Sequence, residues 1–67
     1  MINVNKAKAM PKGWRNSLAV DIQDNLNKLG NNDGIAATPI CKILCKHGIS
    51  DTILVTRQDL EVLLQAL

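Results

Sequence analysis

The sequence has no phenylalanine and no tyrosine, and its one large aromatic side chain is Trp14. This scarcity argues against the nucleic-acid-binding modules that stack bases on several aromatic rings. It favours a core of Leu, Ile, Val and Ala packed between helices. With 46% hydrophobic and 21% charged residues, the chain has the composition of a globular domain and not of a disordered segment.

Long apolar runs and cysteine pairs are missing too. No apolar stretch reaches the roughly 18 residues that a bilayer span needs, and the N-terminal residues do not resemble a secretory signal. The two cysteines, Cys41 and Cys45, lie one turn apart on an expected helix and do not make a disulfide framework. We therefore expect a reducing, cytoplasmic setting.

The chain of 67 residues leaves room for one domain, 1–67. A domain of this size buries only about 60% of its unfolded surface, so a second copy or a partner protein would add stability. The net charge of +2 is unevenly spread, because residues 1–15 contain bases and no acid. No helical or strand period is visible before Pro11. We expect residues 1–12 to form a flexible basic arm.

A helix over 38–47 is predicted by its own end signals. Thr38 is a good N-cap, Pro39 fits the first helical position, and Gly48 can adopt the left-handed conformation that ends a helix. Apolar side chains cover well over half of its circumference and leave two residues for solvent, Lys42 and Lys46. Such a helix is expected to be buried, with the other segments packed around it.

A second helix is predicted over 14–29, where apolar residues recur every three or four positions. Val20 falls outside this stripe and should be exposed, whereas Asn25 projects close to it and must be hydrogen-bonded or lie at its edge. Gly30 closes the helix. Near this end, two side chains are placed for an i,i+4 ion pair, Asp24 and Lys28.

The third predicted helix runs over 56–67, with Thr56 and Asp59 in a capping-box arrangement. The predicted fold is therefore a small all-α domain of three helices. Two apolar triplets, 35–37 and 53–55, each precede a threonine and a helix. If both triplets are extended, they add a minimal two-stranded ribbon; a helical turn is the alternative for 52–55.

The last helix has more apolar surface than one packed face needs. One face is formed by four leucines and a second patch by two smaller residues: Leu60, Leu63, Leu64 and Leu67, then Val62 and Ala66. The polar strip between them is only about 100° wide. The excess indicates burial in a larger core, against a second copy or against a partner protein. Alternatively, the N-terminal segment folds over this helix.

The spacing of Cys41, Cys45 and His47 invites a test for a metal site. Zinc needs three or four ligands that converge on one point, but on a helix Cys45 and His47 point in nearly opposite directions. We therefore expect no metal, two buried cysteines and a packed or capping histidine. No phosphate-binding glycine loop and no readable nucleophile–base pair occurs, so we expect neither a cofactor nor an enzyme.

We expect a non-enzymatic regulatory or adaptor protein that binds another protein, or itself as a homodimer, through its C-terminal helix. The contact residues would be Val62, Ala66, Leu63 and Leu67, with Val20 as an outlier on another helix. No membrane contact is expected.

The alternative is a small DNA-binding regulator. Residues 44–50 resemble the middle of a helix-turn-helix unit, in which a glycine and an apolar residue join two helices. With Gly48 as the turn glycine, Leu54 falls where the second helix needs an inward apolar residue. Leu44 departs from the small residue usual at its position. The phosphate contacts would come from the basic arm and from the 38–47 helix: Lys6, Lys8, Lys12, Arg15, Lys42 and Lys46.

Overall fold

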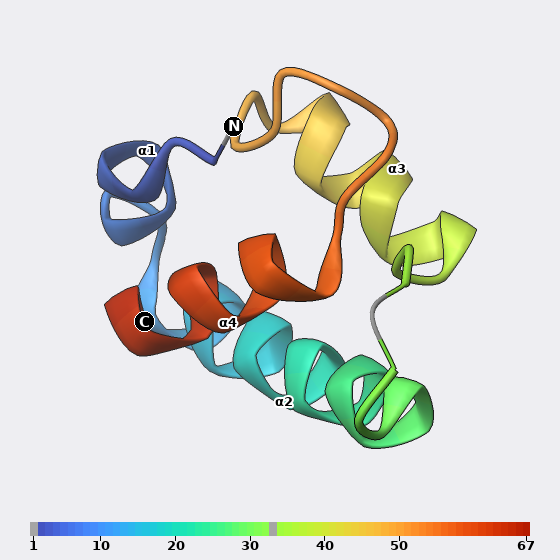
Figure 1. The fold of residues 1–67 in the computed structure, drawn as a ribbon. Helices are drawn as coiled ribbons and strands as arrows, with labels where there is room; N and C mark the ends of the chain where they lie inside the picture. The colour runs from blue at the N-terminus through green and yellow to red at the C-terminus, as the bar shows by residue number, and fades with distance from the viewer. Residues whose placement is uncertain (1, 33) are drawn as a thin grey trace.

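The computed structural model describes residues 2–32 and 34–67 and confirms the all-α class (Figure 1). Its helices within these ranges are α1 (Val4–Lys8), α2 (Lys12–Leu29), α3 (Thr38–Lys46) and α4 (Arg57–Ala66). The three longer ones are the three predicted from the sequence. Each begins within two residues of its predicted start, because the end signals that place helices are local.

Gly30, Gly48 and the Thr56–Asp59 capping box mark helix ends as predicted, whereas the N-cap predicted at Thr38 is wrong. Gly30 and Gly48 follow α2 and α3 with φ of 61° and 73°, the left-handed region that favours glycine. Thr56 accepts a hydrogen bond from the Asp59 N–H at 3.2 Å and donates its own N–H to Asp59 Oδ2 at 3.3 Å. This capping box fixes the start of α4. At α3 the N-cap is Ala37, one residue earlier than predicted.

The predicted ribbon is reduced to one isolated antiparallel bridge between Ile35 and Thr56. Ala36 donates its backbone N–H to the Val55 carbonyl at 2.8 Å, and Arg57 donates its backbone N–H to the Gly34 carbonyl at 3.0 Å. Ala36 and Val55 point into the core, so Ile35 points outward and is 49% exposed. Because no second bridge extends the pairing, residues 52–55 form neither the strand nor the helical turn considered for them.

The last helix, and not the 38–47 helix, is the element on which other helices pack. Leu60 and Leu63 are fully buried, and α4 packs closely against both α2 and α1 (Figure 1). α3 buries Ile40, Cys41 and Leu44 in the core, but it packs closely against no other helix of the described residues, exposes Ile43 to 38% and leaves Cys45 exposed. The expectation that only lysines of that helix reach solvent is therefore wrong, because α3 lies at the edge of the core.

Residues 2–12 differ from the flexible arm expected over 1–12, of which residue 1 lies outside the described residues. Asn3 caps α1 by accepting the Lys6 N–H at 3.1 Å, and its own N–H donates to the Ile49 carbonyl at 2.7 Å. Ala7 is fully buried. A helix of five residues is too short to show a period, and one buried alanine is enough to dock it. The N-terminal segment thus helps to cover α4.

The chain has little surplus surface. Its accessible area is 4299 Å², and a monomeric protein of its mass is expected to expose about 4,200 Å². On α4 itself, Leu60 and Leu63 are buried, whereas Leu64, Ala66 and Leu67 are half-buried and Val62 is exposed. Across the described ranges, none of the helices has the length and hydropathy needed to cross a bilayer.

Candidate functional site

The residues expected to bind a partner on α4 are not equally accessible. Val62 is 49% exposed, and Ala66 and Leu67 are half-buried. Leu63 is fully buried and belongs to the core, so it is not available as a contact residue in this structure. Val20 is 68% exposed, as predicted for its place outside the α2 stripe, but its neighbours one turn away are polar. Of the four predicted contact residues on α4, only Val62 is thus fully on the surface.

The basic residues lie on the surface of α1, α2 and α3. Arg15 is half-buried. The five candidate lysines are all exposed: Lys6, Lys8, Lys12, Lys42 and Lys46. The Lys6 side chain lies over the turn after α3, where a Cβ placed on Gly48 would be 2.6 Å from Nζ. A helix C-terminus favours a cation at this place. The structure thus brings one residue of the basic arm to the helix that carries Lys42 and Lys46.

The helix-turn-helix interpretation is wrong in its geometry. α3 ends at Lys46 and the next helix begins at Arg57, so the residues expected to start a recognition helix form a loop. Ser50 shapes this loop: its hydroxyl donates to the Thr52 carbonyl at 2.6 Å and accepts the Thr52 N–H at 3.3 Å. Leu54, expected to point inward, is 61% exposed.

The cysteines and the histidine occupy three different environments. Cys41 is buried, and its Sγ donates to the Ala36 carbonyl at 3.4 Å. Cys45 is exposed, which corrects the expectation that both cysteines are buried. His47 packs edge-on against Trp14, with ring centroids 4.9 Å apart and an interplanar angle of 67°, as expected for a packed histidine. Residues 2–32 and 34–67 contain no cluster of three metal-ligating side chains.

Hollows of about 430 Å³ lie beside α1 and at the start of α4, and a groove lined by both α2 and α3 is a further concave feature. It consists of two adjoining hollows of about 250 Å³ and 70 Å³ that share Asp21 and Ile43. We call it the α2–α3 groove; besides these two residues its lining is Trp14, Ser17, Leu18, Asn25, Lys28, Ala37, Pro39 and Ile40. One end is thus mainly apolar and the other carries polar side chains.

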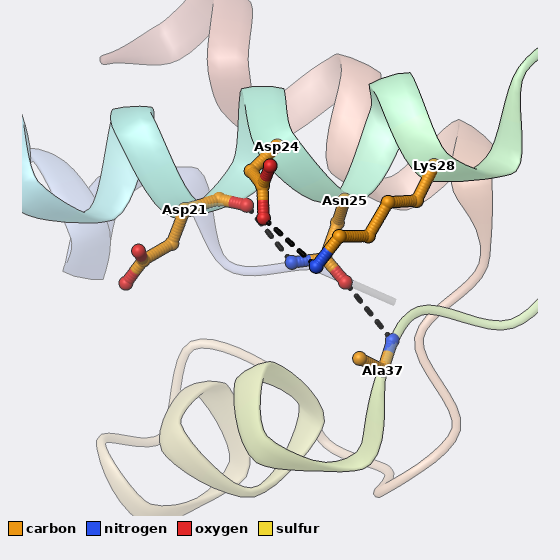
Figure 2. A network of polar contacts seen from close by, with 5 residues as sticks. All are labelled: Asp21, Asp24, Asn25, Lys28 and Ala37. Atoms are coloured by element: carbon orange, nitrogen blue, oxygen red, sulfur yellow. Dashed lines mark hydrogen bonds and ion pairs between the residues drawn. The ribbon is translucent and has the colours of Figure 1, made fainter.

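Asn25 holds the polar end of the α2–α3 groove together (Figure 2). Its amide donates to the Asp21 carbonyl at 2.8 Å, and its Oδ1 accepts the Ala37 N–H at 3.0 Å. The second bond joins α2 to the N-cap residue of α3, which has no side-chain cap of its own. The sequence-based requirement that Asn25 be hydrogen-bonded is confirmed.

The charges of the groove are arranged unequally. Lys28 is engaged by Asp24, whose carboxylate lies 3.1 Å from the ammonium, which confirms the predicted pair. The Asp21 carboxylate extends away from this pair, toward the space beside α3 (Figure 2). Within the described part of the chain, Asp21 takes part in no ion pair. It lines both hollows and is exposed.

Sequence reasoning did not find the α2–α3 groove, because no local pattern says which faces of two helices meet. Two signals were nevertheless present: the single tryptophan, and an aspartate that no base follows one turn later, since Asn25 occupies that position.

Comparison of the chain with protein-family models, with curated proteins and with solved structures found no match. Any functional assignment therefore depends on the geometry described above.

Proposed function

We propose that the chain is a small, non-enzymatic protein-binding module of the regulatory or adaptor kind, and that it binds its partner in the α2–α3 groove. The observation that carries this proposal is a concave surface whose apolar end combines the half-buried Trp14 with the partly exposed Ile43 above a buried floor. Concave sites with apolar linings and a few polar groups are typical of binding sites. Tryptophan is also enriched among the residues that dominate binding energies.

The groove suits this role better than the α4 face proposed from the sequence. Leu63 is in the core, and on the predicted α4 face only Val62 is exposed, with Ala66 and Leu67 half-buried beside it. In contrast, one Asn25 bond, to the Ala37 N–H, joins the two walls of the groove, and the other, to the Asp21 carbonyl, holds the Asn25 side chain on α2. A preformed site loses less conformational entropy when a partner binds.

The test uses Trp14, the only tryptophan, as an internal reporter. Peptides selected on the wild-type protein from a displayed random-sequence library serve as the probe, and titration of Trp14 fluorescence gives their affinity. Ile43→Lys, which places a charge in the apolar end, is expected to weaken binding by about tenfold or more. Val20→Lys is the matched control, because Val20 is exposed and outside the groove; it should leave the affinity unchanged.

Two results would contradict the proposal. One is a library selection that enriches no peptide over the bare support. The other is a set of peptides that bind wild type and Ile43→Lys equally well or leave the Trp14 emission unchanged.

A second candidate function, nucleic-acid binding through basic residues, is supported by the position of Lys6 beside the end of α3. Such binding should be weak and non-specific, because few bases are available and each neutralised phosphate contributes a slope of only about −0.9 to the salt dependence. Titration of duplex DNA over a salt series, with a Lys42→Gln/Lys46→Gln variant, tests it. Tight, sequence-specific binding at physiological salt would favour this function over protein binding.

A further inference from the structure

We infer that the segment bound in the α2–α3 groove carries a basic side chain that pairs with Asp21 and, within about three positions, a large apolar side chain that packs between Trp14 and Ile43. This inference rests on the proposed function and adds to it the chemistry of the partner. It names a class of peptide: a basic residue near an apolar anchor.

The basic residue follows from the charges of the groove. Lys28 is matched by Asp24 at 3.1 Å, which leaves Asp21 as the lining charge that has no ion pair among the described residues. Asp21 also belongs to both hollows, so a segment that lies along the groove must pass it. Cations, and arginine most of all, are the groups that a free carboxylate binds best. An acidic segment would be repelled at the same point.

The apolar residue follows from the other end of the groove. The Trp14 ring packs edge-on against His47, with ring centroids 4.9 Å apart, so His47 already covers one side of the tryptophan. Ile43, 38% exposed, lies across the smaller hollow from it, above the buried Leu18. An apolar side chain placed there would remove exposed surface of both residues from water, which is favourable in proportion to the area covered.

The distance between the two contacts follows from helix geometry. Trp14 and Asp21 are two turns apart on α2, which corresponds to about 10 Å along the helix axis. An extended chain covers this distance in about three residues. The long side chains of lysine and arginine shorten the requirement, so the basic and apolar residues should lie within about three positions of each other.

The experiment measures how selected peptides bind to wild-type protein and to variants, with changes made in the protein and in the peptide. The probe is again the set of peptides selected on wild-type protein, with affinity measured from Trp14 fluorescence. Most enriched peptides should contain the basic and apolar pair. Asp21→Asn should weaken their binding by about tenfold. Glu61→Gln, which makes the same change of net charge on α4, should alter affinity by less than about twofold.

A double-mutant cycle assigns the partner of Asp21. The basic residue of each peptide is replaced by glutamine, and this peptide is titrated against wild type and Asp21→Asn. If the two groups pair, the glutamine substitution in the peptide should weaken binding to wild type but should weaken binding to Asp21→Asn only a little. Binding should also weaken with added salt for wild type and less so for Asp21→Asn.

The outcomes separate this inference from the function on which it rests. If Ile43→Lys abolishes binding while Asp21→Asn and the glutamine peptide do not weaken it, the groove binds peptides but the basic residue is wrong. Enriched peptides without a basic residue would overturn the inference in the same way. If the selection enriches nothing, or Ile43→Lys has no effect, the proposed function fails as well. Asp21 is exposed, so unfolding curves should verify that Asp21→Asn keeps wild-type stability.

Discussion

α3 and α4 have similar sequences in one respect, since each is apolar around most of its circumference, yet they are covered very differently. α4 packs closely against α1 and α2 and buries Leu60 and Leu63 completely. α3 buries three side chains, Ile40, Cys41 and Leu44, and leaves Ile43 38% exposed, but no helix of the described residues packs closely against it. The number of apolar positions on a helix therefore does not decide whether other helices pack closely against it. The tertiary arrangement of the segments that connect the helices decides this.

The connections explain the difference. The bridge between Ile35 and Thr56 anchors the start of α4 beside the loop that leads into α3. From there α4 runs back along α2, and α1 closes over it (Figure 1). α3 is joined to α2 at one end by the Asn25 bond to Ala37 and at the other by the contact of His47 with Trp14. Between these contacts the two helices leave the α2–α3 groove open.

The largest expected effect comes from truncating the core on each helix. Leu63→Ala and Leu44→Ala should each lower the free energy of unfolding by about 2–5 kcal/mol, because both side chains are fully buried. If α4 is the better enclosed helix, Leu63→Ala should cost at least as much as Leu44→Ala. Urea unfolding measures both. Val62→Ala, at a half-exposed position, should stay within about 0.5 kcal/mol of wild type. A similarly small change in either leucine variant would contradict the packing described.

The next effect tests whether α1 packs against α4. Ala7→Leu should destabilise the protein by about 1–3 kcal/mol, because Ala7 is fully buried and a larger side chain must push α1 outward. Ala9→Leu is the control, since Ala9 is exposed. Thermal unfolding compares the two. Equal melting temperatures would show that α1 does not pack as described and that α4 is less covered.

A smaller effect is expected at the start of α4. Thr56→Ala removes the acceptor for the Asp59 N–H and should cost about 1 kcal/mol. Thr52→Ala removes a similar hydroxyl, which accepts the Leu54 N–H at 3.2 Å in an exposed loop, and should cost less. Chemical unfolding of both variants checks the order. The reverse order would show that the loop, and not the capping box, fixes where α4 begins.

The smallest effect on stability is expected on the exposed side of α3. Cys45→Ala should change the free energy of unfolding by less than about 0.5 kcal/mol, whereas Cys41→Ala should destabilise more, because only Cys41 is buried. In the native protein, a thiol reagent should modify Cys45 rapidly and Cys41 only after unfolding. Rapid modification of both cysteines would mean that the face of α3 that carries Cys41 and Leu44 is less well buried than described.

Local features of this protein were predictable. The limits of α2, the capping box of Thr56 and Asp59, and the bonding of Asn25 follow from interactions within about one helical turn or from the cost of burying an amide. Other features were not predictable. α1 is too short to show a period, and the pairing of Trp14 with Ile43 across the groove joins residues far apart in the sequence.

The sequence by itself determined the class of fold, the three longer helices and most of their end signals, because helix formation depends on residues three and four positions apart. Only the tertiary structure decided that Leu63 is core and Ile43 is surface, that α1 covers α4, and that Asp21 stands in a groove with Trp14. The physical reason is that burial depends on which distant segments meet. Each amphipathic helix presents an apolar face, but that face does not specify which partner will cover it.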